Sequence, residues 1–225
     1  MQTEGPYLHR TSDLTPAGRR DFVLANTREV RTGLCPEIPL RLLRPDGPMQ
    51  EEGRHLFDAD SLCPYWAYAW GSGQALCRYV LDHPELVRGR RVVDTGAGSG
   101  IAAIGAAKVG AAQVTALEAD PLALAAIAVN GELNGVRIEL LQGEIMTTTL
   151  QAWDVLFASD IFFYWPENEG VFSLPAGPGR EILVAFPDKR DADRTRLTEL
   201  ARYPVLTVPE IEHPSHQICC VFRVR

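Results

Sequence analysis

The chain has 225 residues, of which 46% are hydrophobic and 23% are charged, and its formal net charge is −7. This is an ordinary globular composition, and the length suits one domain with a full core. The acidity argues against a nucleic-acid partner because carboxylates repel phosphates, and the lack of any run of about 18 apolar residues argues against a membrane span.

The cysteines point to a reducing compartment. Five are present without a C-x-x-C pair, so we expect neither a disulfide framework nor a metal site. Cys219 and Cys220 lie in an apolar run, where reduced thiols act as small hydrophobic side chains. Residues 1–11 are polar and lack the apolar core of a signal peptide. We therefore expect a cytoplasmic protein without a bound metal; the oligomeric state stays open.

Residues 1–70 predict an N-terminal cap on the domain that follows. Residues 15–31 predict a helix, since Pro16 suits a first helical turn and a moderate apolar stripe follows it. Two prolines within 35–39 then force an extended path, because a residue before proline avoids helical angles. Residues 40–63 are expected to be irregular or to form a short hairpin.

From about residue 72 the pattern changes to strands that alternate with helices, which predicts a parallel sheet. The last two strands have too short a connection for a crossover helix, so they should pair antiparallel. The predicted fold of residues 71–225 is α/β, a Rossmann-like sheet of seven mostly parallel strands with a C-terminal antiparallel hairpin and helices on both faces. Strands are predicted over 91–94, 113–117, 136–141, 153–158, 181–186, 205–208 and 217–224, and helices over 101–109, 121–134 and 189–202.

The strand at 91–94 leads into a glycine-rich loop, Asp94-Thr95-Gly96-Ala97-Gly98-Ser99-Gly100. Gly96, Gly98 and Gly100 permit a sharp turn into the next helix and a close approach of a ligand to the backbone. Ligands of open α/β sheets lie beyond the carboxyl ends of the strands, where this loop falls. Glu118 closes the next strand, and a carboxylate there can accept hydrogen bonds from both hydroxyls of a ribose. The loop therefore predicts a site for a nucleoside-bearing cofactor.

Three details favour S-adenosylmethionine over a nicotinamide dinucleotide. The spacing is G-x-G-x-G rather than the G-x-G-x-x-G that seats a pyrophosphate. Asp94 precedes the first glycine by two residues and can help bind an α-ammonium, a group that S-adenosylmethionine carries. The antiparallel hairpin at the end of the sheet is the third detail. A nicotinamide oxidoreductase is a distant alternative.

Two further strand ends supply candidate site residues. Glu144 and Ile145 follow the third strand, where an adenine would place its amine near the carboxylate and its face against the isoleucine; a solvated loop is an equal alternative for Glu144. The fourth strand ends at Asp160, with Tyr164 four residues later. Both are candidate active-site groups, and the two phenylalanines between them are expected in the core.

Several segments of the chain together carry a family resemblance: Phe22 to Thr27, Pro36 to Ile38, Tyr65 to Leu76, Arg78 to Gly100, and Asp120-Pro121 with Asn130 and Asn134. They resemble the electron-transfer-flavoprotein β-subunit lysine methyltransferases, and the resemblance covers about residues 20–164. It implies the use of S-adenosylmethionine, with Trp70 and Gly71 flanking the cofactor and Asp94 to Gly100 and Glu118 binding it. It also places Asp160 and Tyr164 on the family's D-x-F-Y segment, here with one extra residue.

The predicted function is methyl transfer from S-adenosylmethionine to a protein lysine. Carboxylates such as Asp160 or Glu37 would position the incoming cation, and Trp66, Trp70 and Tyr164 could contact it by cation–π interaction; packing of the cap is an equal alternative for Trp66. Residues 165–167 and 185–189 depart from the family pattern. A small-molecule N- or O-methyltransferase and a non-catalytic cofactor-binding module therefore remain alternatives.

Overall fold

Seven strands form one sheet in the order β5-β4-β3-β6-β7-β9-β8. The computed structural model describes residues 14–44, 64–150, 152–161, 170–171, 174, 179–189, 193–206 and 218–225. The strands β5, β4, β3, β6 and β7 are parallel, and β9 pairs antiparallel with both β7 and β8. This confirms the predicted seven-stranded sheet and its antiparallel end. The strands are β3 (Arg91–Thr95), β4 (Gln113–Glu118), β5 (Glu139–Gln142), β6 (Val155–Ser159), β7 (Glu181–Pro187), β8 (Leu197–Pro204) and β9 (Ile218–Val224).

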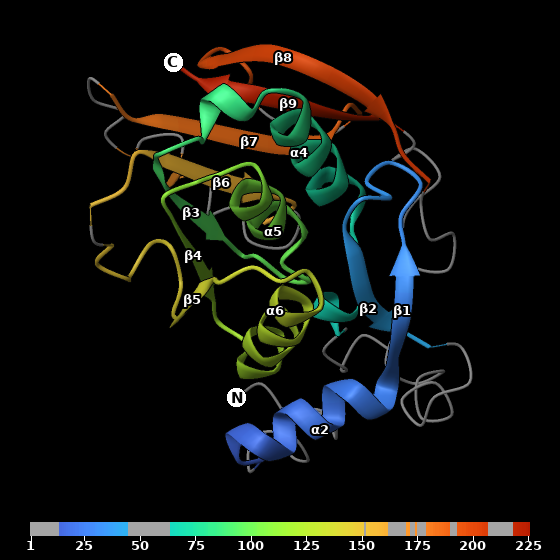
Figure 1. Cartoon of the computed structure of the whole chain (residues 1–225). Helices are drawn as coiled ribbons and strands as arrows, with labels where there is room; N and C mark the ends of the chain where they lie inside the picture. The colour runs from blue at the N-terminus through green and yellow to red at the C-terminus, as the bar shows by residue number, and fades with distance from the viewer. Residues whose placement is uncertain are drawn as a thin grey trace, which may run out of the picture.

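Three helices cover one face of the sheet: α4 (Gly71–Asp82), α5 (Ile101–Lys108) and α6 (Pro121–Leu133), and Figure 1 shows them side by side in front of the strands. Asp120 caps α6, since its side chain accepts a hydrogen bond from the backbone N–H of Leu122. Alanines of α5 and apolar residues of α4 pack on the inward side chains of β3, β6, β7 and β9. A helix this rich in alanine lets the backbone approach the sheet closely.

The opposite face of the sheet carries a second apolar cluster without a helix among the described residues. Its members include Phe186 and Phe222, whose rings stack 4.6 Å apart, and the loop residues Ile145 and Trp153. The prediction of helices on both faces is therefore confirmed for one face only. Among the residues that the structure describes, no helix has the length and apolar character needed to cross a membrane.

The predicted helix over 189–202 is wrong wherever the structure describes it, because residues 193–196 contain a turn and Leu197–Pro204 is strand β8. Leu197 and Leu200 have helical spacing, but this strand has a register shift between Glu199 and Ala201 that disturbs its twofold alternation. Pairing with β9 decides the conformation, and the strand predicted over 205–208 accordingly lies earlier in the chain, with 207–208 outside the described residues.

The N-terminal segment contains helix α2 (Pro16–Asn26), the antiparallel strands β1 (Thr27–Arg31) and β2 (Pro39–Leu43), and the short 3-10 helix η1 (Tyr65–Ala67). The helix predicted over 15–31 is right up to Asn26 and wrong beyond it. The side chains of Asn26 and Thr27 bond back to the carbonyls of Phe22 and Val23, which closes the helix at this point. The chain then enters β1, which pairs antiparallel with β2, the next strand in sequence, to form a hairpin.

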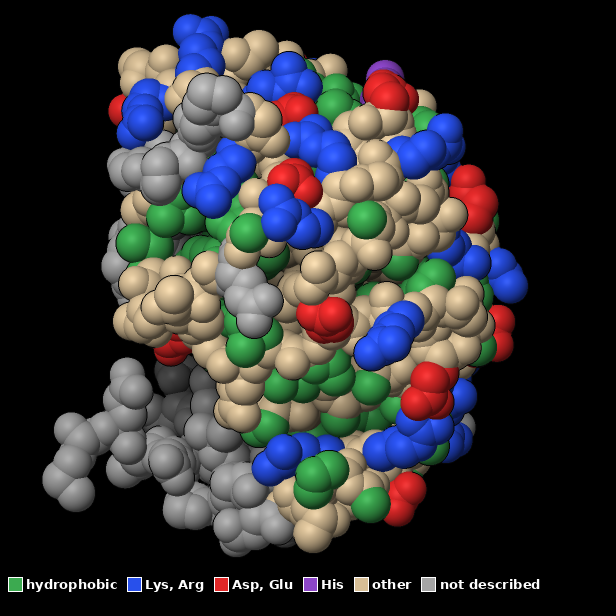
Figure 2. All heavy atoms as spheres, turned by 60° about the vertical axis from the view of Figure 1, so that its left-hand side comes forward, with side chains coloured by type: hydrophobic (Ala, Val, Ile, Leu, Met, Phe, Trp, Pro, Cys, Tyr) green, Lys and Arg blue, Asp and Glu red, His purple; other side chains and the backbone are tan. Residues whose placement is uncertain are grey.

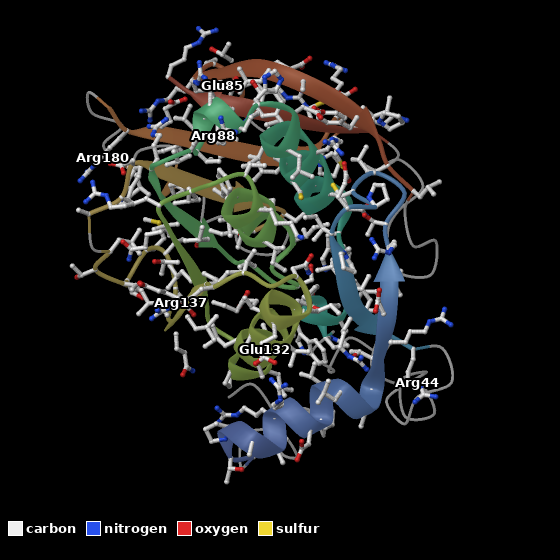
Figure 3. The ribbon with its side chains drawn as sticks, in the orientation of Figure 1. Arg44, Glu85, Arg88, Glu132, Arg137 and Arg180 are labelled. Atoms are coloured by element: carbon white, nitrogen blue, oxygen red, sulfur yellow. The ribbon has the colours of Figure 1, made fainter. Side chains whose placement is uncertain are left out.

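The N-terminal segment shares its core with the rest of the protein. Val23 of α2 and Trp66 of η1 pack with apolar residues of α6, and Ile38 and Leu40 pack with residues of α4 and α5. Arg20 of α2 also donates two hydrogen bonds to Glu132, which Figure 3 labels on α6. These contacts join the described residues of the N-terminal segment to α4, α5 and α6.

Ion pairs gather where the parallel strands begin. Arg90 contacts Glu181 at 2.6 Å, and Arg91 contacts Asp154 at 2.7 Å. Hydrogen bonds from Arg91 hold the pKa of Asp154 well below its ordinary value. Figure 2 brings this side of the molecule forward and shows basic and acidic side chains intermixed over it. The amino ends of the strands are thus fastened by charge pairs, and the glycine loop lies at the other ends.

Candidate active site

The candidate site lies where β3, β4 and β6 end and α4 begins. Gly96 N donates to Leu117 O of β4 at 2.9 Å, and Gly98 N donates to the Glu118 carboxylate at 3.0 Å. From β6, the Asp160 carboxylate accepts from Ser72 N at 3.2 Å. The structure therefore brings the glycine loop, Glu118 and Asp160 to one edge of the sheet, as the strand order requires.

The three glycines of the loop have positive φ angles of 62° (Gly96), 52° (Gly98) and 80° (Gly100), which other residues rarely adopt. They differ in what surrounds them. A Cβ at Gly96 would collide with the Ile161 side chain, and a Cβ at Gly100 would lie 3.2 Å from Ile127. Among the residues that the structure describes, a Cβ at Gly98 would meet only the Gly96 backbone oxygen, 3.9 Å away. Gly98 therefore faces open space, which is where a ligand can approach the backbone.

Asp94 is buried directly beneath this loop, with 1% of its surface exposed. One carboxylate oxygen, Oδ2, accepts from Ala103 N at 3.0 Å in the first turn of α5. The other, Oδ1, has no hydrogen-bond partner among the residues that the structure describes. Burial raises the pKa of Asp94 to about 7; the Ala103 N–H opposes this rise, and the charge of Glu118 adds to it. Asp94 thus bonds to the first turn of α5 through one oxygen and leaves the other buried without a partner among the described residues.

Glu118 binds the loop through the backbone. Its Oε2 accepts from Gly98 N, and its Oε1 accepts from Ala119 N at 2.8 Å and Asp120 N at 3.3 Å. Burial raises the pKa of Glu118, while these three N–H groups lower it. A carboxylate has about four acceptor positions, so three bonds leave one open. A ribose can use it, and a second hydroxyl would have to share an oxygen with a backbone donor.

Asp160 adopts a left-handed conformation with φ of 57°, which aspartate tolerates better than most residues. This turn directs its carboxylate to Ser72 N, in the first turn of α4. The N-cap residue of that helix, Trp70, provides no capping side chain, since its indole donates to Tyr65 O at 2.8 Å. Asp160 therefore supplies the negative charge that a helix amino terminus favours.

Aromatic rings surround the start of α4. The Trp70 ring lies 5.7 Å from Tyr65 and 5.9 Å from Tyr68, and all three are partly exposed. Trp66 is buried to 1% exposure in the core beneath the cap. The packing alternative for Trp66 is therefore confirmed, and Gly71, also buried, opens α4 between these rings and the site.

The remaining predicted residues occupy different surroundings. Ile145 is buried with Leu117 in the cluster on the far face of the sheet, and Glu144 is exposed on the turn before it. Glu37 accepts from Arg78 at 2.8 Å, and this interaction lowers its pKa. Arg78 lies six residues beyond Ser72, about 9 Å along α4, so Glu37 is anchored away from Asp160. Tyr164 lies outside the described residues.

Three residues of the site were missed by sequence reasoning. Ser72 receives Asp160, Ile161 packs on Gly96, and Asn130 bonds to the Ser99 carbonyl at 2.9 Å. Only Asn130 left a signal, as a polar residue that follows the apolar run 121–129 of the predicted helix.

Two relatives share extended similarity with this chain. Electron transfer flavoprotein beta subunit lysine methyltransferase of Rattus norvegicus is 41% identical over 204 residues, which cover 84% of this chain and 76% of that protein. Its namesake from Xenopus laevis is 39% identical over 155 residues, 68% of this chain and 61% of the relative. The chain belongs to this family. The aligned region spans only about three fifths of the Xenopus protein.

Two further comparisons agree on the class. The family model of ribosomal protein L11 methyltransferase matches residues 68–161. A solved structure of magnesium protoporphyrin IX methyltransferase from Synechocystis with bound S-adenosylmethionine is 14% identical and aligns with a TM-score of 0.51, over 68% of this chain and 77% of that chain; it shares the fold. Family membership confirms the predicted enzyme class, an S-adenosylmethionine-dependent methyltransferase, and the predicted cofactor.

The described residues fit this cofactor. The open space over Gly98 admits a ligand against the backbone, Glu118 retains an acceptor position for a ribose hydroxyl, and Asp94 Oδ1 is a buried acceptor without a partner among the residues that the structure describes. A cation close to Asp94 and Glu118 would also relieve the repulsion between a buried and a half-buried carboxylate.

Proposed function

We propose that this protein transfers a methyl group from S-adenosylmethionine to a lysine side chain of a protein substrate of the electron-transfer-flavoprotein β-subunit kind. The observation that carries the proposal is the 41% identity to a lysine methyltransferase over 84% of the chain. The charge and the aromatic rings around the start of α4 suit a cationic acceptor.

For the cofactor, we propose the roles that the sequence predicted. Gly96, Gly98 and Gly100 cradle the ligand, Glu118 holds the ribose, and Asp94 stabilises the ammonium through Oδ1 or through a bridging water. Trp70 and Gly71 flank the methionine portion at the start of α4. Glu144 and Ile145 border the adenine, and the burial of Ile145 against Leu117 gives that ring an apolar edge to rest on.

For the acceptor, we propose that Asp160 and Tyr164 hold the incoming lysine. When bound, the cofactor supplies an activated methyl group on a sulfonium, so the chain must chiefly align the nucleophile and exclude water. The amine must also lose its proton, against an ordinary lysine pKa near 10.4. Burial among Tyr65, Tyr68 and Trp70 would lower that pKa, whereas the Asp160 carboxylate attracts the cation before the proton leaves.

Glu37 was also predicted to position the incoming lysine, and we keep this role as a proposal. Its ion pair with Arg78 satisfies the carboxylate, so an incoming lysine would compete with a guanidinium. Replacing Glu37 by Gln should change the apparent KM for the protein substrate if the carboxylate meets the lysine, and should leave it unchanged otherwise.

Incubation of the purified protein with radiolabelled S-adenosylmethionine and a recombinant electron-transfer-flavoprotein β-subunit tests the proposal. We expect label on lysine of that subunit, located by peptide mass spectrometry. A substrate with its lysines acetylated is the matched control. Label on a metabolite and none on protein would overturn the lysine assignment, while cofactor binding without transfer to any acceptor would identify a binding module.

A small-molecule N- or O-methyltransferase is the second candidate. It is favoured by the region after β7, where residues 185–189 depart from the family pattern and Asp188 forms ion pairs with Arg194 and Arg202. This region contributes to the acceptor side of the sheet, so a change here alters what the site admits.

The cytoplasmic location and the division into a cap of residues 1–70 and a domain of residues 71–225 complete the proposal. Cys35, Cys77, Cys219 and Cys220 are buried in the apolar core, where reduced thiols act as small hydrophobic side chains.

A further inference from the structure

Asn130 is a fully buried polar side chain on α6, with 0% of its surface exposed. Its Nδ2 donates to Ser99 O at 2.9 Å, and its Oδ1 accepts from Arg41 N at 2.7 Å. The two bonds define the orientation of the carboxamide, because a flipped amide would face a carbonyl with its oxygen and an N–H with its nitrogen. One side chain thus joins the glycine loop to strand β2 of the N-terminal hairpin, 58 positions away from the loop in sequence.

The same face of α6 continues this connection in both directions. Ile127, three residues before Asn130, fills the space that a side chain at Gly100 would need. Asn134, four residues after it, donates from Nδ2 to Pro39 O at 2.7 Å at the start of β2. Residues spaced by three and four share a helix face. This face of α6 therefore contacts the glycine loop at one end and the hairpin at the other, and only Asn130 bonds to both among the described residues.

We propose that Asn130 is a positioning residue for the cofactor: it fixes the Ser99 carbonyl, and through it the Gly98 backbone, with the N-terminal hairpin as its second anchor. The peptide after Ser99 leads into Gly100 at a φ of 80°, and the residue before Ser99 donates its N–H to Glu118. Rotation of the Ser99 peptide would therefore move Gly100 and the Gly98 N–H that bonds to Glu118. Cofactor binding to the loop should accordingly stabilise the hairpin as well. The inference rests on the cofactor and is independent of the acceptor.

A matched pair of alanine variants tests this role. Asn130→Ala removes the bond to the loop and the bond to β2, whereas Asn134→Ala removes a bond to β2 from the same helix and leaves the loop untouched. We expect titration calorimetry with S-adenosylmethionine to show a Kd raised roughly tenfold for Asn130→Ala, the equivalent of about 1.4 kcal/mol, and a Kd within about twofold of wild type for Asn134→Ala. Both variants should melt at a lower temperature.

A purely structural Asn130 would lower the melting temperature and leave the Kd unchanged, or would change the Kd by the same factor as Asn134→Ala; either result overturns the proposal. Hydrogen exchange of the wild-type protein gives a test that needs no variant. The Arg41 amide, which bonds to Asn130, should exchange several-fold more slowly with saturating S-adenosylmethionine, and equal exchange with and without it contradicts the link. Failure of the wild-type protein to bind S-adenosylmethionine would instead contradict the cofactor assignment.

Discussion

Replacing Asp94 by Asn should make this protein more stable at neutral pH and lower its affinity for the cofactor. In the unfolded chain this carboxyl ionises near 3.8, and in the folded protein it holds its proton up to a pKa of about 7. Between those pH values the unfolded state has released a proton that the folded state retains. Raising the pH through this window therefore lowers the free energy of unfolding. The stability that the retained proton contributes is completely lost above the folded pKa.

The size of the effect follows from the same two values. One pH unit corresponds to about 1.36 kcal/mol, so the two units between pH 5 and pH 7 correspond to roughly 3 kcal/mol. The Asn variant has no such titration. An amide nitrogen in place of Oδ1, which lacks a partner among the described residues, costs about 1–3 kcal/mol, and this cost is the same at every pH. The difference in stability between variant and wild type should hence grow by roughly 3 kcal/mol from pH 5 to pH 8.

Urea unfolding followed by circular dichroism at pH 5, 6, 7 and 8 measures that difference, because every other titrating group is common to the two proteins. A difference that stays flat across the series would refute the reasoning, and with it the claim that this carboxyl is held protonated by burial. Calorimetry of S-adenosylmethionine binding at pH 6 in buffers of different ionisation enthalpy should show proton release by the wild type and none by the variant. Affinity should be lower in the variant at pH 8, where wild-type Asp94 is ionised.

Three further substitutions examine the site, and a fourth, Gly135→Ala, serves as a control outside it. Gly98→Ala and Gly135→Ala should each lose about 1–2 kcal/mol of stability in thermal melts, since both glycines have positive φ and open surroundings. Calorimetry should show lost cofactor affinity only for Gly98→Ala. Equal affinities of the two variants would mean that the loop does not contact the cofactor. Glu118→Gln places an amide against backbone N–H donors and should weaken S-adenosylmethionine binding by about 1–3 kcal/mol, a result that a wild-type Kd in the folded variant would contradict. Asp160→Asn keeps an acceptor for Ser72 N and tolerates the left-handed angle, so cofactor affinity should persist while kcat falls at least about tenfold; an unchanged kcat would remove Asp160 from the acceptor site.

Local chemistry made much of the site predictable. Glycine is the residue that accepts positive φ, so the loop from Gly96 to Gly100 could be recognised without its surroundings. A proline after Asp120 marks the start of α6 in the same way. Strand order then followed from alternation and from short connections, and it placed Glu118 and Asp160 beside the loop because parallel strands end at one edge of a sheet.

The points at which a helix gives way to a strand could not be predicted in this manner. Thr27 opens a strand because it pairs with β2, and Leu197 begins another because it pairs with β9, although both sequences permit a helix. Glu37 has the charge expected of a cation-binding residue, and its meeting with Arg78 depends on how the hairpin packs against α4.

The sequence by itself determined the cofactor loop, the class of fold and the family, because these depend on backbone preferences and on the order of short apolar segments. Tertiary structure alone decided which polar groups meet. It turned Asp94 into a buried acid beneath the loop, with one oxygen capping α5, and it made Asn130 the connection between loop and hairpin. The physical reason is burial: a carboxyl or an amide removed from water must find its partner in the fold, and that partner can lie anywhere in the chain.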